Sequence, residues 1–210
     1  MMEKIIFDLD GTLLDTSPGI YECARFAGRK LGFPELSEEQ LYSFVGPPLK
    51  DSFMRAYGCS EEDGQALTDT YREHYREGAV LKAEPYDGIF ELLDSLSRMG
   101  LDLAVATAKP QIFAEQVLEH FGFSKYMSEI CGADLTGKLT KTDIIRKCVG
   151  DREASACVMV GDTEHDAKGA YEAGVPFIGV SYGFGNPEKR ANYPAIGIAA
   201  SPLEILNFVA

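Results

Sequence analysis

Two carboxylates, Asp8 and Asp10, stand directly after a short apolar run near the start of the chain. Acidic residues are depleted from strands, and a buried charge is costly unless it is paired or bound to a metal. Residues two apart in extended backbone point to the same side, so both carboxylates can face one small space. Gly11 permits a tight turn after them, and the Thr12 hydroxyl is expected to hold that turn. The spacing therefore leaves two possibilities, an ordinary polar turn or a pair of carboxylates that performs chemistry.

A second acidic motif, GDTEHD, places Asp162 and Asp166 four residues apart, on one face of an expected helix start. Two carboxylates about 4 Å apart repel each other by about 4 kcal/mol at an effective dielectric near 20, and a third increases the repulsion. Such a cluster needs a divalent cation, a proton or both. Oxygen ligands without sulfur or imidazole favour Mg²⁺, so His165 is expected at the surface or beside the metal ligands rather than on the metal itself.

The chain is strongly acidic, with a formal net charge of −13. Such a surface repels nucleic acid and anionic membranes, so we expect neither as a partner. A site for an anionic substrate would need local cations. Lys138 and Lys141 both precede an apolar helical pattern, and either could supply that charge. We favour Lys141 because the helical pattern follows it immediately.

The elements that must position these residues are short apolar runs separated by helical patterns. Three runs end at Asp8, Thr107 and Asp162, and a fourth ends near Ser181. Their length and composition suit buried parallel strands. One helical pattern between them has Pro110 at its expected first position. This alternation predicts an α/β fold with a doubly wound, Rossmann-like parallel sheet, in which ligands bind outside the carboxyl ends of the strands.

Residues 17–81 do not follow this alternation, because they contain mainly helical patterns. A helical block inserted after the first strand suggests a lid above the strand ends. We therefore expect two domains: an α/β core made of residues 1–16 and 82–210, and a small helical cap made of residues 17–81.

The sequence shows neither a membrane span nor a signal peptide. No apolar run approaches the ~20 residues that a span requires, and Asp8 interrupts the apolar run near the N-terminus. The cysteines include no C-x-x-C pair, so we expect small buried thiols rather than a zinc site or a disulfide framework. They are Cys23, Cys59, Cys131, Cys148 and Cys157. These features indicate a cytoplasmic protein.

Four motifs in order resemble those of the haloacid dehalogenase-like hydrolases. They are FDLDGTLLDT, VATAKP, the single Lys141 before a helix, and MVGDTEHD. The resemblance covers essentially the whole chain, including the helical insertion between the first two motifs. The segments GPPLKDSF, TAKP and YGFG also resemble the phosphoglycolate phosphatase-like branch.

This resemblance implies Mg²⁺-dependent hydrolysis of a small phosphomonoester through an aspartyl phosphate. Asp8 would be the nucleophile. Asp10 would protonate the leaving alcohol and later activate the hydrolytic water. Mg²⁺ would be held by Asp8, the backbone carbonyl of Asp10, and Asp162.

The resemblance also implies roles for residues around this centre. The phosphoryl oxygens would be held by the Thr107 hydroxyl and by the amides of Ala108, Leu9 and Asp10. Lys141 would neutralise their charge and that of Asp8. Asp166 would orient Lys141 or a metal-bound water, with Thr12 as further support. Lys109 follows Thr107 closely, and we expect it to be exposed or to face the cap, without a defined role.

The resemblance leaves the reaction partner open. Phosphoglycolate is the substrate that the branch implies, while sugar phosphates, sugar phosphomutase-type transfer, a nucleotidase and a pyrophosphatase remain alternatives in the same fold. A receiver-like signalling module is disfavoured, because Asp8 lies in the first motif and GDTEHD in the last. A binding module with an inactive phosphatase fold is disfavoured because every expected catalytic side chain is present. We expect a small phosphorylated metabolite as the partner, and a monomer or homodimer.

Overall fold

The computed structural model describes residues 2–134 and 138–209. The chain forms two compact units, one made of residues 1–14 and 85–210, the other of residues 15–84. It passes from one to the other within the short strands β2 (Leu14–Asp15) and β3 (Glu84–Pro85).

The first unit is built on a six-stranded sheet with the order β5-β4-β1-β6-β7-β8, in which all described pairs are parallel. The strands are β1 (Lys4–Phe7), β4 (Asp102–Pro110), β5 (Glu129–Ala133), β6 (Cys157–Gly161), β7 (Phe177–Val180) and β8 (Gly197–Ala199). β1, β6 and β7 are buried along their whole length, as expected for strands covered on both faces.

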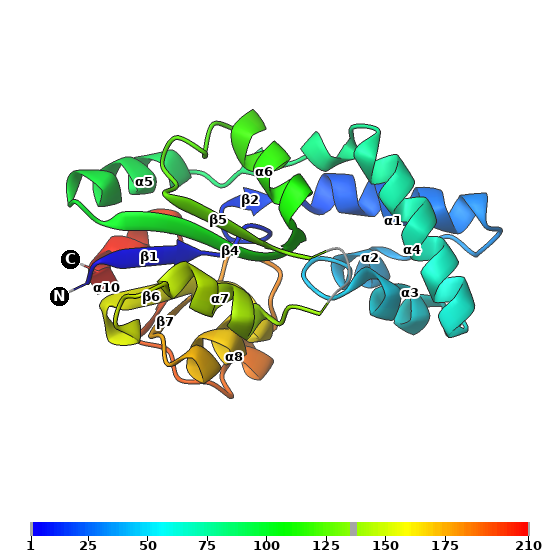
Figure 1. Ribbon diagram of the computed structural model, residues 1–210. Coiled ribbons are helices and arrows are strands. Elements are labelled where there is room, and N and C mark those ends of the chain that lie inside the picture. The colour runs from blue at the N-terminus through cyan, green and yellow to red at the C-terminus, as the bar shows by residue number, and fades with distance from the viewer. Residues whose placement is uncertain (1, 135–137, 210) are drawn as a thin grey trace. The chain divides into compact units, whose positions relative to one another are not determined.

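Helices cover both faces of this sheet. They are α5 (Ile89–Arg98), α6 (Gln111–His120), α7 (Lys141–Val149), α8 (Glu164–Ala173), α9 (Pro187–Arg190) and α10 (Leu206–Val209), with 3₁₀ turns η2 (Ala154–Ala156) and η3 (Pro202–Ile205). Figure 1 shows α5 and α6 on one face and α7 and α8 on the other. The predicted doubly wound α/β fold is therefore confirmed.

The boundary between β4 and α6 differs from the expectation. β4 continues past Thr107 to Pro110, and its pairing with β5 shifts register between Ala106 and Pro110. Pro110 has extended backbone (φ −53°, ψ 138°) and is the N-cap of α6, so the helix begins at Gln111 rather than at the proline. The expectation of Pro110 as the first helical residue was wrong by one position. This longer strand sets the direction of the Lys109 side chain.

The second unit is helical. It contains α1 (Ser17–Lys30), α2 (Glu38–Tyr42), α3 (Leu49–Tyr57), α4 (Glu61–Arg76) and the 3₁₀ turn η1 (Ala79–Leu81). Its interior is aromatic: the Phe53 ring packs edge-on against Phe44, with ring centres 4.9 Å apart, and against Tyr71 at 6.3 Å. All three side chains are buried, so this unit has an apolar core of its own. Its role as a cap remains a proposal.

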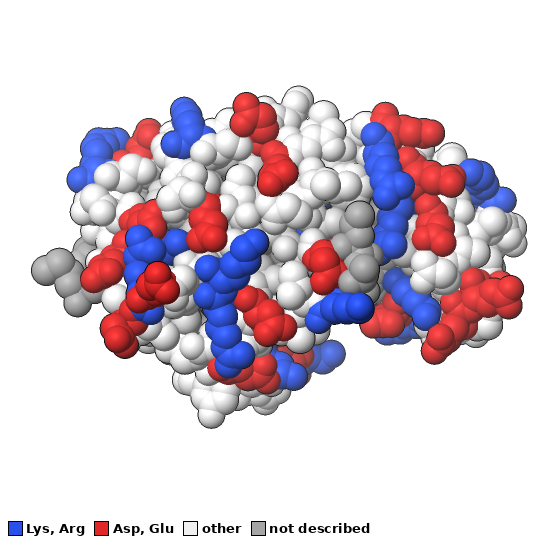
Figure 2. All heavy atoms as spheres, viewed as in Figure 1, with Lys and Arg blue, Asp and Glu red and all other residues white. Residues whose placement is uncertain are grey.

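Charged side chains of both signs are interspersed over the face drawn in Figure 2. Within the described residues, no helix has both the length and the apolar character that crossing a membrane requires.

Candidate active site

Three polar residues lie at or just beyond the carboxyl ends of three neighbouring strands. Asp8 follows β1, Thr107 lies near the end of β4, and Asp162 follows β6. Because β1 lies between β4 and β6, the chain leaves these strand ends in opposite directions on either side, which is where open α/β sheets bind ligands. All three side chains are buried, so the predicted residues meet away from bulk water.

Asp166 completes a cluster of three buried carboxylates. Oxygen atoms of Asp8, Asp162 and Asp166 all lie within 4.8 Å of one another. Asp166 is the third residue of α8 and closes a capping box, in which its Oδ2 accepts from the amide of Thr163 at 2.9 Å. This bond fixes the carboxylate and turns Oδ1 toward the cluster. The capping role and the site role therefore belong to the same side chain.

Lys141 supplies the cation. It is the first residue of α7, and its Nζ lies 2.6 Å from Asp8 Oδ1 and 2.7 Å from Asp166 Oδ1. The helix begins there because Thr140 caps it through a capping box with Asp143. Lys138, the other candidate, is exposed. Of the two lysines that the sequence left open, the structure brings Lys141 to the carboxylates.

The electrostatics follow from burial. Burial raises the pKa of Asp8 well above its ordinary value, and the neighbouring carboxylates Asp166, Asp162 and Asp10 add to this, while Lys141 opposes it. Burial and Asp166 raise the pKa of Asp162 to about 7. Burial alone would lower the pKa of Lys141, but Asp166 and Asp8 raise it above the usual range, so this lysine is a permanent cation. The positive charge of Lys141 does not balance the negative charges of the three clustered carboxylates when all of them are ionised.

Asp162 offers an oxygen suited to a metal. Its Oδ2 accepts from the amides of Phe184 at 2.7 Å and Gly185 at 3.1 Å. Its Oδ1 is buried and has no hydrogen-bond partner among the described residues. A buried carboxylate oxygen without a partner is costly, and a divalent cation would satisfy it. The surrounding donors are oxygens, which fits Mg²⁺.

Glycines let the backbone approach this carboxylate. Gly11 has a φ of +81°, and a Cβ there would lie 2.4 Å from Asp162 Oδ2. A Cβ on Gly183 would lie 2.5 Å from the same oxygen. The DGT and YGFG segments therefore enclose Asp162 closely. The sequence had not predicted this contact for YGFG.

Lys109 is a site residue that sequence reasoning missed. Its Nζ lies 3.0 Å from Asp10 Oδ1, and its side chain is only 7% exposed. Of the two alternatives that we expected, an exposed lysine is therefore wrong, and a lysine that faces the cap stays a prediction. The cause is the continuation of β4: residues two apart in extended backbone share a side, so Lys109 follows Thr107 toward the strand ends. Its amide also donates to Thr107 Oγ1 at 3.1 Å. The i, i+2 spacing was the signal that could have revealed it.

The turn after Asp10 is held differently from the expectation. The Thr12 hydroxyl is buried and has no hydrogen-bond partner among the described residues, so it does not hold the turn. Backbone bonds do: the Gly11 amide donates to the Leu14 carbonyl at 2.8 Å, and the Leu13 amide to the Leu9 carbonyl at 3.0 Å. The backbone satisfies the turn by itself.

Three other predicted positions complete the site's surroundings. Leu9 is buried, Ala108 is exposed at the end of β4, and His165 is exposed, as expected. The phosphate-binding roles of the Leu9 and Ala108 amides remain predictions.

The chain belongs to the haloacid dehalogenase-like hydrolase family, whose model matches residues 5–180. The motifs that carried the resemblance lie within this match.

Similar proteins carry several names. A 5'-nucleotidase of Pseudomonas aeruginosa is 41% identical over 195 residues, covering 91% of this chain and 88% of the relative. Tyrosine-protein kinase PtkA of Mycobacterium tuberculosis is 34% identical, covering 89% of this chain and 64% of the relative. A phosphoglycolate phosphatase of Agrobacterium fabrum is 35% identical, covering 85% of this chain and 80% of the relative. The crystal structure of a "predicted phosphatase" from Clostridium acetobutylicum matches with a TM-score of 0.92 and 39% identity, covering 100% of this chain and 98% of that one.

The first prediction separates the two lysines. Lys141→Met removes the cation from a buried ion pair, which costs about 3 kcal/mol of unfolding free energy near pH 8 without added metal. The loss shrinks near pH 5, where the carboxylates with raised pKa values bind protons instead. Denaturant titration measures both. Lys138→Met is the control and changes stability by less than about 0.5 kcal/mol. Equal losses in the two variants would contradict the assignment.

The second prediction concerns pH. Because the pKa values of Asp8 and Asp162 are raised in the folded protein, the metal-free fold holds protons that the unfolded chain has lost, so stability falls as pH rises toward about 7. A Mg²⁺ ion bound by these carboxylates would displace the protons, so we expect its affinity to rise from about pH 6 to about pH 8, by up to tenfold per pH unit for each proton released. The Mg²⁺-induced rise in melting temperature therefore grows with pH. Asp162→Asn abolishes this rise, and an effect of Mg²⁺ independent of pH would contradict the prediction.

Proposed function

We propose that this chain is a Mg²⁺-dependent phosphatase that hydrolyses a small phosphomonoester through an aspartyl phosphate on Asp8. One observation carries the proposal: the buried Asp8 carboxylate, at the end of the central strand, is held 2.6 Å from the Lys141 ammonium. Membership of a hydrolase family supports the same reading.

Asp8 has one oxygen for positioning and one for attack. Lys141 holds Oδ1, which leaves Oδ2 to attack phosphorus. The new O–P bond forms as the ester P–O bond breaks, and the leaving oxygen takes its electrons and a proton from Asp10. Water then attacks the aspartyl phosphate, giving its proton to Asp10 and releasing phosphate and Asp8. Splitting one difficult displacement into two is the advantage of covalent catalysis.

Asp10 is the proton carrier in this proposal, and Lys109 is its positioning residue. The ion pair at 3.0 Å fixes Asp10 Oδ1, so that Oδ2 can meet the leaving oxygen. Proton transfer by a positioned acid contributes about 10²–10⁴-fold to rate. Loss of Lys109 therefore acts through Asp10.

The anion site combines fixed donors with positive charge. We propose that the Thr107 hydroxyl and the amides of Leu9, Asp10 and Ala108 hold the phosphoryl oxygens, and that Lys141 neutralises their charge. Asp8, the Asp10 carbonyl and Asp162 would hold Mg²⁺, with Asp166 orienting Lys141. When bound, Mg²⁺ would supply the positive charge that relieves repulsion between carboxylate and phosphate.

Two substrate classes have separate support. The relative with 41% identity is a 5'-nucleotidase, which favours nucleoside 5'-monophosphates. The 35% identical phosphoglycolate phosphatase favours phosphoglycolate, the substrate that the branch motifs implied. The name of the PtkA relative suggests a different acceptor for the phosphoryl group, namely a tyrosine hydroxyl in place of water. A panel of phosphometabolites, ranked by kcat/KM and assayed with and without a tyrosine peptide, separates these choices.

We place the protein in the cytoplasm, because its five cysteines are all unpaired and reducing compartments maintain free thiols. A monomer or homodimer remains our expectation for its assembly.

The third prediction tests the nucleophile. Asp8→Asn loses at least about a thousandfold of the Mg²⁺-dependent kcat on p-nitrophenyl phosphate, because an amide cannot form the aspartyl phosphate. Asp15→Asn is the matched control from the same motif, since Asp15 Oδ1 accepts from the Ser17 amide at 2.9 Å and is not one of the three clustered carboxylates. It keeps the rate within about threefold.

Wild-type turnover in folded Asp8→Asn would disprove the assignment, and inactivity of the wild-type protein toward the whole panel with Mg²⁺ would disprove the function. Beryllofluoride provides an independent check, since its adduct is expected on Asp8.

The fourth prediction tests Lys109 through a double-mutant cycle. Asp10→Asn lowers kcat/KM for an alkyl phosphate by about 10²–10⁴-fold, and far less for p-nitrophenyl phosphate, whose leaving group needs no proton. Lys109→Met shows the same dependence on the leaving group. The double variant is no slower than Asp10→Asn alone, because both changes remove the same function, proton transfer by a positioned Asp10. Additive losses would show that Lys109 acts independently of Asp10.

A further inference from the structure

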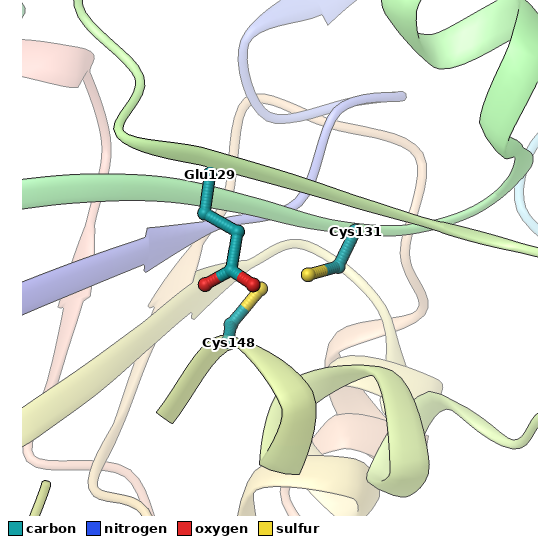
Figure 3. Close-up of side chains that lie close together, drawn as sticks. All are labelled: Glu129, Cys131 and Cys148. Carbon is teal, nitrogen blue, oxygen red and sulfur yellow. The ribbon is translucent and has the colours of Figure 1, made fainter. Parts of the chain in front are cut away.

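A second cluster of metal-ligating side chains lies outside the candidate active site. Ligand atoms of Glu129, Cys131 and Cys148 all lie within 4.8 Å of one another. Glu129 and Cys131 are two residues apart on β5, so they share a face, and Cys148 belongs to α7, which packs on that strand. Figure 3 shows the three side chains directed toward the same space. The fold thus brings together cysteines that are 17 residues apart in the sequence.

We propose that Glu129, Cys131 and Cys148 bind a thiophilic divalent cation of the zinc class. Two thiolates and one carboxylate are the ligand types that zinc takes, and three protein ligands leave the fourth tetrahedral position for water. The sequence argued against zinc because it lacks a C-x-x-C pair, but here the second thiol comes from a helix rather than from the same turn.

The geometry is close to what such a cation needs. Bonds of about 2.0–2.3 Å in a tetrahedral site put ligand atoms roughly 3.3–3.8 Å apart, so the cluster must contract by at most about 1.5 Å. Both sulfurs are fully buried, while the Glu129 side chain is 36% exposed. The carboxylate therefore lies between the thiols and solvent, where it can receive the cation first.

The charges around the cluster also balance. Lys4 Nζ lies 3.3 Å from Glu129 Oε2 and 3.6 Å from Asp102 Oδ2, so it keeps a carboxylate partner when Glu129 turns to a metal. Two thiolates and Glu129 carry three negative charges, which equal the charge of one divalent cation plus that of Lys4. Asp102 has a separate partner in Arg152, at 2.8 Å. Binding releases two thiol protons to solvent per cation.

Cobalt is the probe, because Co²⁺ bound to thiolate gives a charge-transfer absorption that carboxylate sites lack. The reduced full-length protein is titrated with Co²⁺ in excess Mg²⁺, which occupies the carboxylate cluster. We expect one thiolate-bound Co²⁺ per chain. Cys131→Ser and Cys148→Ser each weaken binding at least tenfold, and Glu129→Gln weakens it about tenfold.

Cys157→Ser is the matched control, because Cys157 is a fully buried strand thiol of the same core that lies outside the cluster. It keeps the absorption and the affinity. Hydrolysis of p-nitrophenyl phosphate or circular dichroism verifies that each variant is folded.

Stability gives a second readout. With Zn²⁺ about a hundredfold above its Kd for the wild type, the melting temperature rises by roughly 5–10 °C in the wild type and in Cys157→Ser, and by at most about half as much in Cys131→Ser or Cys148→Ser. The proposal is overturned if excess Co²⁺ gives no thiolate absorption in the wild type. It is equally overturned if folded Cys131→Ser and Cys148→Ser bind Co²⁺ as tightly as the wild type.

Discussion

Mutual repulsion among buried carboxylates is the constraint on which this site depends. Oxygens of Asp8, Asp162 and Asp166 lie within 4.8 Å of one another and are shielded from water. Charges in such a place weaken a fold unless opposite charge and hydrogen bonds compensate them. Lys141 contacts two of the three, which leaves two negative charges when all are ionised. That remainder equals the charge of one divalent cation, so the instability of the metal-free cluster and the proposed affinity for Mg²⁺ would have the same origin.

The surrounding structure serves to keep this arrangement rigid. Asp8 and Asp162 are fixed by adjacent buried strands, and Asp166 by the capping box that starts α8. Gly11 and Gly183 allow the backbone to close around Asp162, where any Cβ would collide with the carboxylate. Preorganised charge of this kind needs little rearrangement during phosphoryl transfer, which is why positioning and electrostatics supply most of the catalysis in such reactions.

The sequence predicted what depends on local periodicity and missed what depends on longer-range geometry. Short apolar runs ending in polar residues were enough to place Asp8 and Asp162 together, and a helix start was enough to favour Lys141. Lys109 was misplaced because its direction depends on how far β4 continues and on a register shift against β5, neither of which the local pattern reveals. The amide of Phe184 reaches Asp162 from 22 residues away, and no local signal predicts such a bond.

Helix α7 links the carboxylate cluster to the thiol cluster, since Lys141 begins it and Cys148 lies in its last turn. The two clusters differ in chemical hardness, which would keep their proposed cations apart. Carboxylate oxygens select small, hard Mg²⁺, whereas thiolates bind it poorly and prefer zinc-class ions. A cation at Cys148 would tie α7 to β5 and so restrict the helix that presents Lys141 to Asp8. The thiol site would then act on the ion pair by holding its helix in place, without contact with the phosphoryl group.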